Sequence, residues 1–274
     1  MTGTPNEELW YTMFAVGHPA LMAFQRVHKR LPSPPRCKLC FVPFRGIGGA
    51  FMRWRGRRPT SRNPQYCNLC DRFIRDHPGG AEVELSMVFV DVRGSTPLAE
   101  RMTPTDFGRA MSRFSAAATR VLNETDGFII DFVGDAIEGV YPPGFSGPEH
   151  ARKAVGAAEG LLRLAVPAAP DGSLLQLGAG VHTGAVYIGT VSGADGAVEY
   201  VRALGDNVNT AARLAAMAQP GEVLISNATC SASGLTLDHL ERRTLELKGK
   251  SVPISVRVMR RGSEASAGLH SAMI

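Results

Sequence analysis

The 274-residue sequence lacks any long apolar segment of the kind that crosses a membrane. The longest candidate, residues 9–24, falls short of the roughly 18 apolar residues that a spanning helix needs, and it contains His18 and Pro19. The sequence also lacks a basic stretch followed by an unbroken apolar run, so we expect no signal peptide. These absences predict a cytoplasmic protein with no membrane span.

Cysteine is scarce, and four of the five cysteines stand in two close pairs, Cys37 with Cys40 and Cys67 with Cys70. This pattern favours metal ligation in a reducing compartment over disulfides. Two such pairs supply four thiolates for a tetrahedral site, so we predict a structural Zn²⁺. An iron–sulfur cluster is the alternative, and free buried thiols are the plain interpretation. Cys230 stands alone and is expected to be a core residue.

Charge of one sign is not in large excess, because 30 Lys and Arg face 25 Asp and Glu, a formal net charge of +5. Six arginines nevertheless fall between Arg45 and Arg62, with Phe51 and Trp54 among them. A solvated loop is the plain interpretation, and a surface for phosphate or acidic partners is the alternative. Nucleic acid is not expected as a partner, because so few aromatic residues interleave the arginines.

The composition, 44% apolar and 20% charged, is that of a protein with an ordinary core. A turn-forming stretch at residues 77–80 separates two different sequence patterns. We expect residues 1–80 to form an apolar helix and a zinc-knuckle-like module with the four cysteines. Residues 81–262 should form the main domain, and residues 263–274 a disordered tail.

Beyond residue 80, strand-like and helix-like patterns alternate. Strands are expected at 84–92, 128–133, 136–141, 174–188 (interrupted at 182–184), 198–203, 242–247 and 253–259. Helices are expected at 107–122, 149–164 and 207–218. Hairpins mixed with helices predict an α+β fold in which helices cover a largely antiparallel sheet.

Two aspartates stand next to apolar, strand-like runs. Asp91 ends the run that begins near Ser86, and Asp135 follows Gly134 between two apolar segments. A carboxylate in such surroundings is costly unless a cation or strong donors meet it. The pair therefore indicates a divalent-metal site that handles phosphate.

Five short motifs occur in order along the chain, and together they are characteristic of one protein family. They are FVDVRGST from Phe89, DG at 126 with VGDA around Asp135, VHTG from Val181 with Gly189, LGDNVNTAARL from Leu204, and LKGK from Leu247. Over about residues 84–259 the sequence resembles the catalytic domain of the class III nucleotidyl cyclases, the adenylyl and guanylyl cyclases. The resemblance implies a ferredoxin-like core.

The resemblance also implies a reaction, in which the ribose 3′-oxygen of a nucleoside triphosphate attacks the α-phosphorus and pyrophosphate leaves. Asp91, Asp135 and the backbone carbonyl of Val92 match the ligands of two Mg²⁺ or Mn²⁺ ions. Arg213 matches the arginine that stabilises charge on the α-phosphate, and Asn209 the asparagine that orients the ribose.

Two further features follow from the resemblance. Lys248 or Lys250 matches a lysine that contacts phosphate, and the sequence leaves the choice open. Family members draw the metal aspartates from one subunit and the Asn/Arg helix from the other. One complete set in one chain therefore implies a head-to-tail homodimer with two equivalent sites.

The base-reading positions depart from the adenylyl pattern. Adenylyl cyclases carry Lys where this chain has Asp131, and Asp or Thr where it has Arg202. Guanine offers donors to a carboxylate and an acceptor to an arginine, which suits GTP, but the two side chains would also suit pairing with each other and relaxed specificity. Prokaryotic cyclases of this overall pattern are mostly of the adenylyl type, so adenylate cyclase, making cyclic AMP from ATP, is the prediction. Guanylate cyclase and a degenerate, nucleotide-binding domain are the alternatives.

Overall fold

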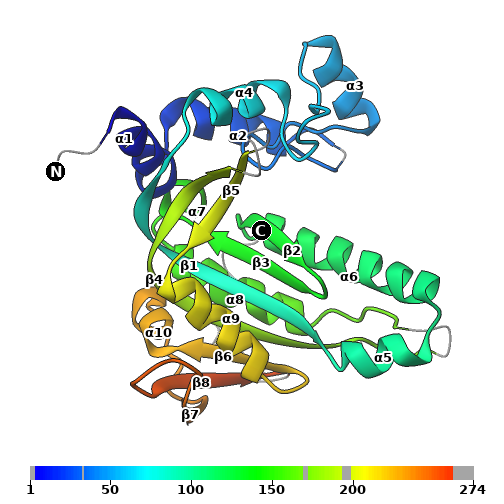
Figure 1. Ribbon diagram of the computed structural model, residues 1–274, viewed down its shortest axis with the longest axis vertical. Coiled ribbons are helices and arrows are strands. Elements are labelled where there is room, and N and C mark those ends of the chain that lie inside the picture. Colours follow the sequence, from blue (N-terminus) through cyan, green and yellow to red (C-terminus); the bar gives the residue numbers. More distant parts are fainter. Residues whose placement is uncertain (1–3, 33, 169–171, 193–198, 262–274) are drawn as a thin grey trace. The chain divides into compact units, whose positions relative to one another are not determined.

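The computed structural model describes residues 4–32, 34–168, 172–192 and 199–261 (Figure 1). It divides into two compact units, which are described separately. The smaller unit comprises Met1–Val83, Pro143–Phe145 and Tyr187–Ala203, and the larger one comprises Glu84–Pro142, Ser146–Val186 and Leu204–Ile274. Within the described ranges, no helix combines the length and the apolar character that a membrane crossing needs. The predicted tail at residues 263–274 lies outside these ranges.

The smaller unit is mainly helical. Its elements are α1 (Pro5–Tyr11), the π-helical turn η1 (Thr12–Val16), α2 (Pro19–Lys29), α3 (Gly46–Trp54), α4 (Asn68–Asp76), most of α7 (Pro143–Ser146) and nearly all of β5 (Glu199–Leu204). The expected apolar N-terminal helix is thus broken, at Gly17 and Pro19. Its apolar side chains are partly buried within the unit, where Phe14 stacks on Trp10 at 5.6 Å and on Phe145 at 5.0 Å between ring centroids.

An eight-stranded sheet supports the larger unit. Its strands are β1 (Gly80–Arg93), β2 (Phe128–Val133), β3 (Ala136–Tyr141), β4 (Gln176–Ser192), β6 (Glu222–Ser226), β7 (Glu241–Leu245) and β8 (Ile254–Arg260), in the order β2-β3-β1-β4-β6-β8-β7, and β5 pairs with β4. β4 and β6 are parallel, and the other described registers are antiparallel. The predicted α+β class, with a mostly antiparallel sheet, is confirmed.

The helices of the larger unit cover both faces of this sheet. They are α5 (Ser95–Arg101), α6 (Pro104–Glu124), α8 (His150–Leu162), α9 (Asp206–Met217) and α10 (Asn227–Ser233). β6 shows the division, because successive side chains of a strand point to opposite faces. Val223 and Ile225 join the core formed with α6 and α8, whereas Leu224 joins the core formed with α9. α9 therefore lies on the face opposite α6 and α8.

The sheet differs from the prediction at two strands, β4 and β6. β4 continues through His182–Gly184, where an interruption was expected. The polar side chain of His182 does not break the strand, because it bonds to Ser226 of the neighbouring strand β6. β6 was not expected at all. It is a five-residue strand, and all five of its residues are buried. Short, fully buried strands lack the polar–apolar alternation that identifies a half-buried strand.

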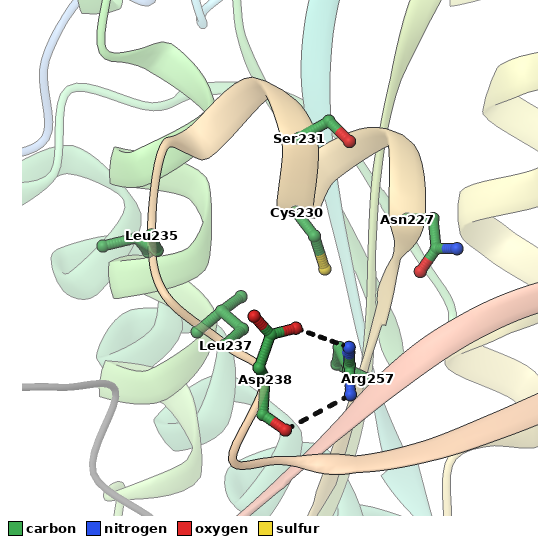
Figure 2. Close-up of a pocket in the computed structure, with 7 residues that line it drawn as sticks. All are labelled: Asn227, Cys230, Ser231, Leu235, Leu237, Asp238 and Arg257. Carbon is green, nitrogen blue, oxygen red and sulfur yellow. Dashed lines mark hydrogen bonds and ion pairs between the residues drawn. The ribbon is translucent and has the colours of Figure 1, made fainter.

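A cavity of about 290 Å³ opens in the larger unit beside α10 and β8 (Figure 2). Arg257 and Asp238 form an ion pair of 2.7 Å at one side of it, and Cys230 lies at another. None of the residues that line this cavity belongs to the predicted active site. Cys230 is half-buried and packs against the main core, as expected.

Candidate active site

The two predicted metal ligands come from adjacent strands. Asp91 lies near the end of β1 and pairs with Ala136 of β3, and Asp135 occupies the turn just before β3. The backbone amide of Val92 donates to the carbonyl oxygen of Asp135 at 3.3 Å. Gly134 makes this turn possible, because its φ of 62° is one that side chains disfavour. The hairpin thus brings Asp91, Val92 and Asp135 to one end of the β1–β3 ladder.

Arg93 is a site residue that the sequence analysis missed. Its guanidinium forms an ion pair with Oδ2 of Asp91 and donates at 2.9 Å to the carbonyl oxygen of Ala216, in the last turn of α9. Burial lowers the pKa of Arg93, and the nearby Asp135 carboxylate partly restores it. The signal was present in the sequence, since residues i and i+2 of a strand share a face.

The Asp91 carboxylate fits a divalent cation. Its Oδ1 atom is buried and, among the described residues, has no hydrogen-bond partner. Buried polar atoms are almost always paired, so an orphaned carboxylate oxygen calls for an explanation. Hard cations such as Mg²⁺ and Mn²⁺ take oxygen ligands of this kind. Asp135, half-buried on the adjoining turn, supplies a second carboxylate.

The predicted nucleotide-contacting residues lie on α9. Gly180 of β4 allows this helix a close approach, because a Cβ there would lie 2.4 Å from the backbone nitrogen of Ala215. The buried side of α9 consists of Thr210, Ala211, Leu214 and Ala215, while Asn209 is exposed and Arg213 is half-buried. Asn209 and Arg213, four residues apart, therefore share one side of the helix.

The Lys248–Lys250 turn lies beside the same helix. Lys250 forms an ion pair with Asp206 in the first turn of α9. A Cβ on Gly249 would lie 3.5 Å from Nη2 of Arg213, so this guanidinium lies against the turn. Lys248 is exposed and Lys250 is half-buried. The structure thus places two cationic side chains, Arg213 and Lys250, and Asn209 along α9, and Lys248 lies on the adjoining turn.

A buried network holds the start of α9 on the sheet. His182 Nε2 lies 3.0 Å from Oδ1 of Asn207, and the Asn207 amide donates to the carbonyl oxygen of Ala185 at 2.8 Å. On its other side, His182 Nδ1 lies 2.8 Å from the Ser226 hydroxyl. Burial lowers the pKa of His182, so the imidazole is neutral at physiological pH. His182 acts here as a positioning residue.

The network continues through hydroxyl groups to a second histidine. Ser226 lies 3.2 Å from the Thr229 hydroxyl, Thr229 bonds Thr183 at 3.1 Å, and Thr183 bonds Ser86 at 2.7 Å. Ser86 in turn lies 3.0 Å from Nδ1 of His150, and burial lowers the pKa of this histidine too.

The predicted base-reading residues belong to different units. Asp131 of β2 lies in the larger unit, just after a register shift, and its Oδ1 accepts from the backbone amide of Phe132 at 2.9 Å. Arg202 of β5 lies in the smaller unit, where its guanidinium carbon is 5.5 Å from the ring centroid of Tyr200.

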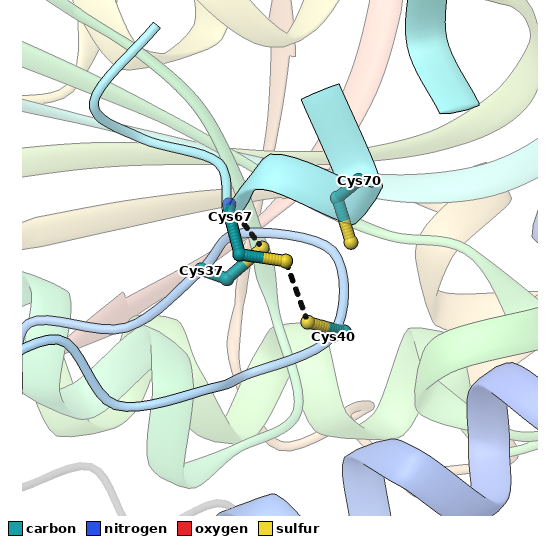
Figure 3. A group of neighbouring side chains, drawn as sticks. All are labelled: Cys37, Cys40, Cys67 and Cys70. Carbon is teal, nitrogen blue, oxygen red and sulfur yellow. Dashed lines mark hydrogen bonds between the residues drawn. The ribbon is translucent and has the colours of Figure 1, made fainter. Parts of the chain in front are cut away.

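The four predicted cysteines form one buried cluster in the smaller unit (Figure 3). Their sulfur atoms all lie within 4.8 Å of one another, and those of Cys40 and Cys67 are 3.6 Å apart. A Zn–S bond of about 2.3 Å implies sulfur atoms roughly 3.8 Å apart in a tetrahedron. The donor set therefore fits a tetrahedral metal ion.

Contacts within the cluster shift the cysteine pKa values in opposite directions. Burial raises the pKa of Cys37, and hydrogen bonds from the other cysteines raise that of Cys70. Hydrogen bonding from Cys37 lowers the pKa of Cys40 and of Cys67. A metal ion would take all four as thiolates.

Comparison with known proteins identifies the family. The family model described as the adenylate and guanylate cyclase catalytic domain matches residues 81–259, so the chain belongs to this family of nucleotide cyclases. It is 30% identical over 180 residues to the terminal-differentiation-specific adenylate cyclase of Dictyostelium discoideum, which covers 63% of this chain and 8% of that protein. The chain spans about a third or less of the curated relatives that it matches.

Solved structures agree on the fold. The guanylyl cyclase Cya2 matches with a TM-score of 0.59 and 23% identity, over 66% of this chain and 93% of that one. The adenylyl cyclase CyaB from P. aeruginosa matches with a TM-score of 0.56 and 24% identity, over 66% and 95%. The expected cyclase-like architecture is thus confirmed.

Proposed function

We propose that this purine nucleotide cyclase is an adenylate cyclase, which converts ATP to 3′,5′-cyclic AMP and pyrophosphate. The observation that carries the proposal is the Asp91–Asp135 pair with its orphaned buried oxygen, on a domain of the cyclase family. ATP is supported by the relative named as an adenylate cyclase. Guanylate cyclase remains the alternative, supported by Asp131 and Arg202 in place of the adenine-reading pair.

The chain's own residues would divide the work as follows. Asp91, Asp135 and the carbonyl of Val92 would hold two Mg²⁺ or Mn²⁺ ions. When bound, these ions would acidify the ribose 3′-hydroxyl and neutralise the phosphates. Arg213 would hold the charge that develops on the α-phosphate, because a guanidinium fork matches its oxygens.

Three further side chains would position the nucleotide. Asn209 would orient the ribose from the same side of α9 as Arg213. Lys250 is the better placed of the two lysines for the phosphates, since its ion pair holds it at the first turn of α9. Lys248 is exposed and remains available for the same role.

The proposed active form is a head-to-tail homodimer. Asp91 and Asp135 of one subunit would face Asn209 and Arg213 of the other, which gives two equivalent sites. An isolated subunit would then be inactive although each subunit carries every residue.

The test is product identification. Purified full-length chain is incubated with ATP or GTP and with Mg²⁺ or Mn²⁺, and the products are separated by mass. Cyclic AMP with ATP is the expected result. Cyclic GMP from GTP, with no cyclic product from ATP, would transfer the assignment to guanylate cyclase. No product from an intact dimer would favour a domain that binds nucleotide without turnover.

We also propose that the four cysteines hold a structural Zn²⁺, because four sulfur ligands leave no open coordination position. Metal analysis of anaerobically purified protein should give one zinc per chain. A visible absorption band with bound iron would instead assign an iron–sulfur cluster.

A further inference from the structure

Helix α3 of the smaller unit exposes an apolar face. Ile47 is 82% exposed, Phe51 46% and Trp54 79%. Their spacing of four and three residues places them on one side of the helix. The rings of Phe51 and Trp54 lie 6.0 Å apart between centroids, so the aromatic surface is continuous. Isolated apolar side chains are common at surfaces, but a contiguous group marks a contact site.

Glycine contacts fix which side of α3 faces outward. A Cβ on Gly48 would lie 2.3 Å from the carbonyl oxygen of Pro32, and one on Gly49 would lie 2.5 Å from the backbone of Phe44. Met52 is buried on this same inner side. The helix therefore packs through its glycines, and it has no room to turn Ile47 or Trp54 inward.

Positive charge surrounds this apolar face. Residues 36–70 include eight Lys and Arg and no Asp or Glu. Arg45, Arg55 and Arg58 are exposed, and among the described residues none of the three forms an ion pair with a carboxylate. The exposed apolar face is therefore flanked by basic residues, and residues 36–70 contain no acidic residue. Such a surface is complementary to a partner with an anionic surface layer above an apolar interior.

The cysteine cluster anchors this segment at both ends. α3 lies between Cys40 and Cys67, and Nη1 of Arg57 lies 3.9 Å from the Cys67 sulfur. Arg53 also donates to the carbonyl oxygen of Phe44 at 2.8 Å. The exposed face is therefore presented on a braced segment, which reduces the conformational entropy lost on docking.

We propose that α3, with Arg45, Arg55 and Arg58, docks on an anionic lipid bilayer. Ile47, Phe51 and Trp54 would enter the boundary between headgroups and acyl chains, where tryptophan is favoured. The arginines would bind the lipid phosphates, an attraction that adds up over several side chains. A nucleic acid satisfies the charges equally well but gives Ile47 no apolar partner, so the bilayer is the better match.

Trp54 supplies a direct probe of docking. The chain has two tryptophans, and the other, Trp10, is fully buried. Full-length protein is mixed with vesicles of phosphatidylcholine that contain about one third phosphatidylglycerol. We expect co-sedimentation, a blue shift of the tryptophan emission and quenching by brominated lipid. Vesicles of phosphatidylcholine alone should bind far less, and salt should weaken binding. Trp54→Phe should remove the shift and keep the binding.

Two kinds of variant separate the contribution of the apolar face to vesicle binding from that of the arginines. Ile47→Asp should weaken partitioning about tenfold, because it removes a buried apolar side chain from the docked state. Each of Arg45→Gln, Arg55→Gln and Arg58→Gln should weaken it about fivefold. Val252→Asp is the matched control, since Val252 is 70% exposed in the larger unit. It should leave binding unchanged.

Three outcomes would overturn the proposal. The folded protein could fail to bind anionic vesicles, or Ile47→Asp and Val252→Asp could weaken binding to the same extent. The protein could also bind duplex DNA and not the vesicles. Circular dichroism and zinc content establish that each variant is folded.

Discussion

Arg93 holds one oxygen of the Asp91 carboxylate, Oδ2, while the other, Oδ1, is buried with no hydrogen-bond partner among the described residues. The guanidinium thus acts as an internal counterion where a divalent cation is proposed. The same guanidinium also bonds the last turn of α9 through Ala216. The proposed metal ligands and the proposed nucleotide helix are therefore joined by one side chain within each subunit.

Arg93→Gln should lower the Mn²⁺ concentration that gives half-maximal activity. The cation then no longer competes with the guanidinium for Oδ2, and a partly buried pair of this kind contributes about 1 kcal/mol, which corresponds to roughly fivefold in affinity. Titration of cyclase activity with Mn²⁺ measures the shift. Arg109→Gln is the control, because Arg109 forms an exposed ion pair with Asp106 on α6. An unchanged or raised Mn²⁺ requirement in Arg93→Gln would contradict the counterion role.

Asp135→Ala and Arg213→Ala should each abolish activity while the dimer persists. A mixture of the two should recover activity, because a heterodimer has one site with both native residues. Random exchange makes half of the dimers mixed, so about a quarter of native activity is expected. Size-exclusion chromatography checks the dimer, and a cyclase assay checks the recovery. If mixing restores nothing although subunits exchange, the shared-site proposal fails.

Replacing both base-reading candidates should shift the substrate preference toward ATP. Asp131→Lys with Arg202→Asp restores the charges of the adenylyl pattern, and hydrogen-bond readout of a base discriminates strongly, so the ratio of kcat/KM for ATP over GTP should rise about tenfold or more. Each single variant places two like charges at the base and should lose activity. A ratio that stays constant in all three would mean that these residues do not read the base.

Stability should fall as the pH falls below the ordinary histidine pKa of 6.5. His150 and His182 have lowered pKa values because burial disfavours the charged imidazolium. The unfolded chain therefore binds protons first, so the stabilisation is complete above 6.5 and is lost toward acid. Urea unfolding at a series of pH values should show this slope. His182→Gln should flatten it, whereas exposed His239→Gln should not.

Cys40→Ser should remove the bound metal and destabilise the smaller unit by several kcal/mol, on the order expected for a structural zinc site. Cys230→Ser is the matched control, because Cys230 lies outside the cluster. Metal content and thermal unfolding measure both. Retention of a full equivalent of zinc in Cys40→Ser would contradict four-sulfur ligation.

Much of the larger unit could be predicted from local pattern. The β2–β3 hairpin has the predicted boundaries, because apolar runs flank a Gly-Asp turn and leave little choice of register. β6 escaped prediction because a buried parallel strand depends on its neighbours, here β4 and β8, rather than on its own alternation. Its neighbours come from distant parts of the sequence.

In the candidate site, too, local pattern predicts some residues and misses those that depend on distant partners. Asp91 and Asp135 were recognisable because carboxylates beside apolar strands are rare, and the four cysteines because their spacing is specific. Arg93 was missed although it stands two residues after Asp91 on the same face of β1, because its second partner, Ala216, is known only once α9 is placed against β1. The link from His182 to His150 runs through four hydroxyl side chains, and hydroxyl residues carry no pattern of their own in a sequence.

The contact between two glycines has a consequence for engineering. A Cβ on Gly189 of β4 would lie 2.5 Å from the Cα of Gly80, and Thr190 donates its backbone amide to Gly79 at 2.7 Å. The segment that follows α4 therefore completes its fold against a strand more than a hundred residues later. A chimaera that transplants residues 1–80 alone would leave this backbone edge without its partner. A graft that moves the module intact has to carry the β4–β5 ribbon with it.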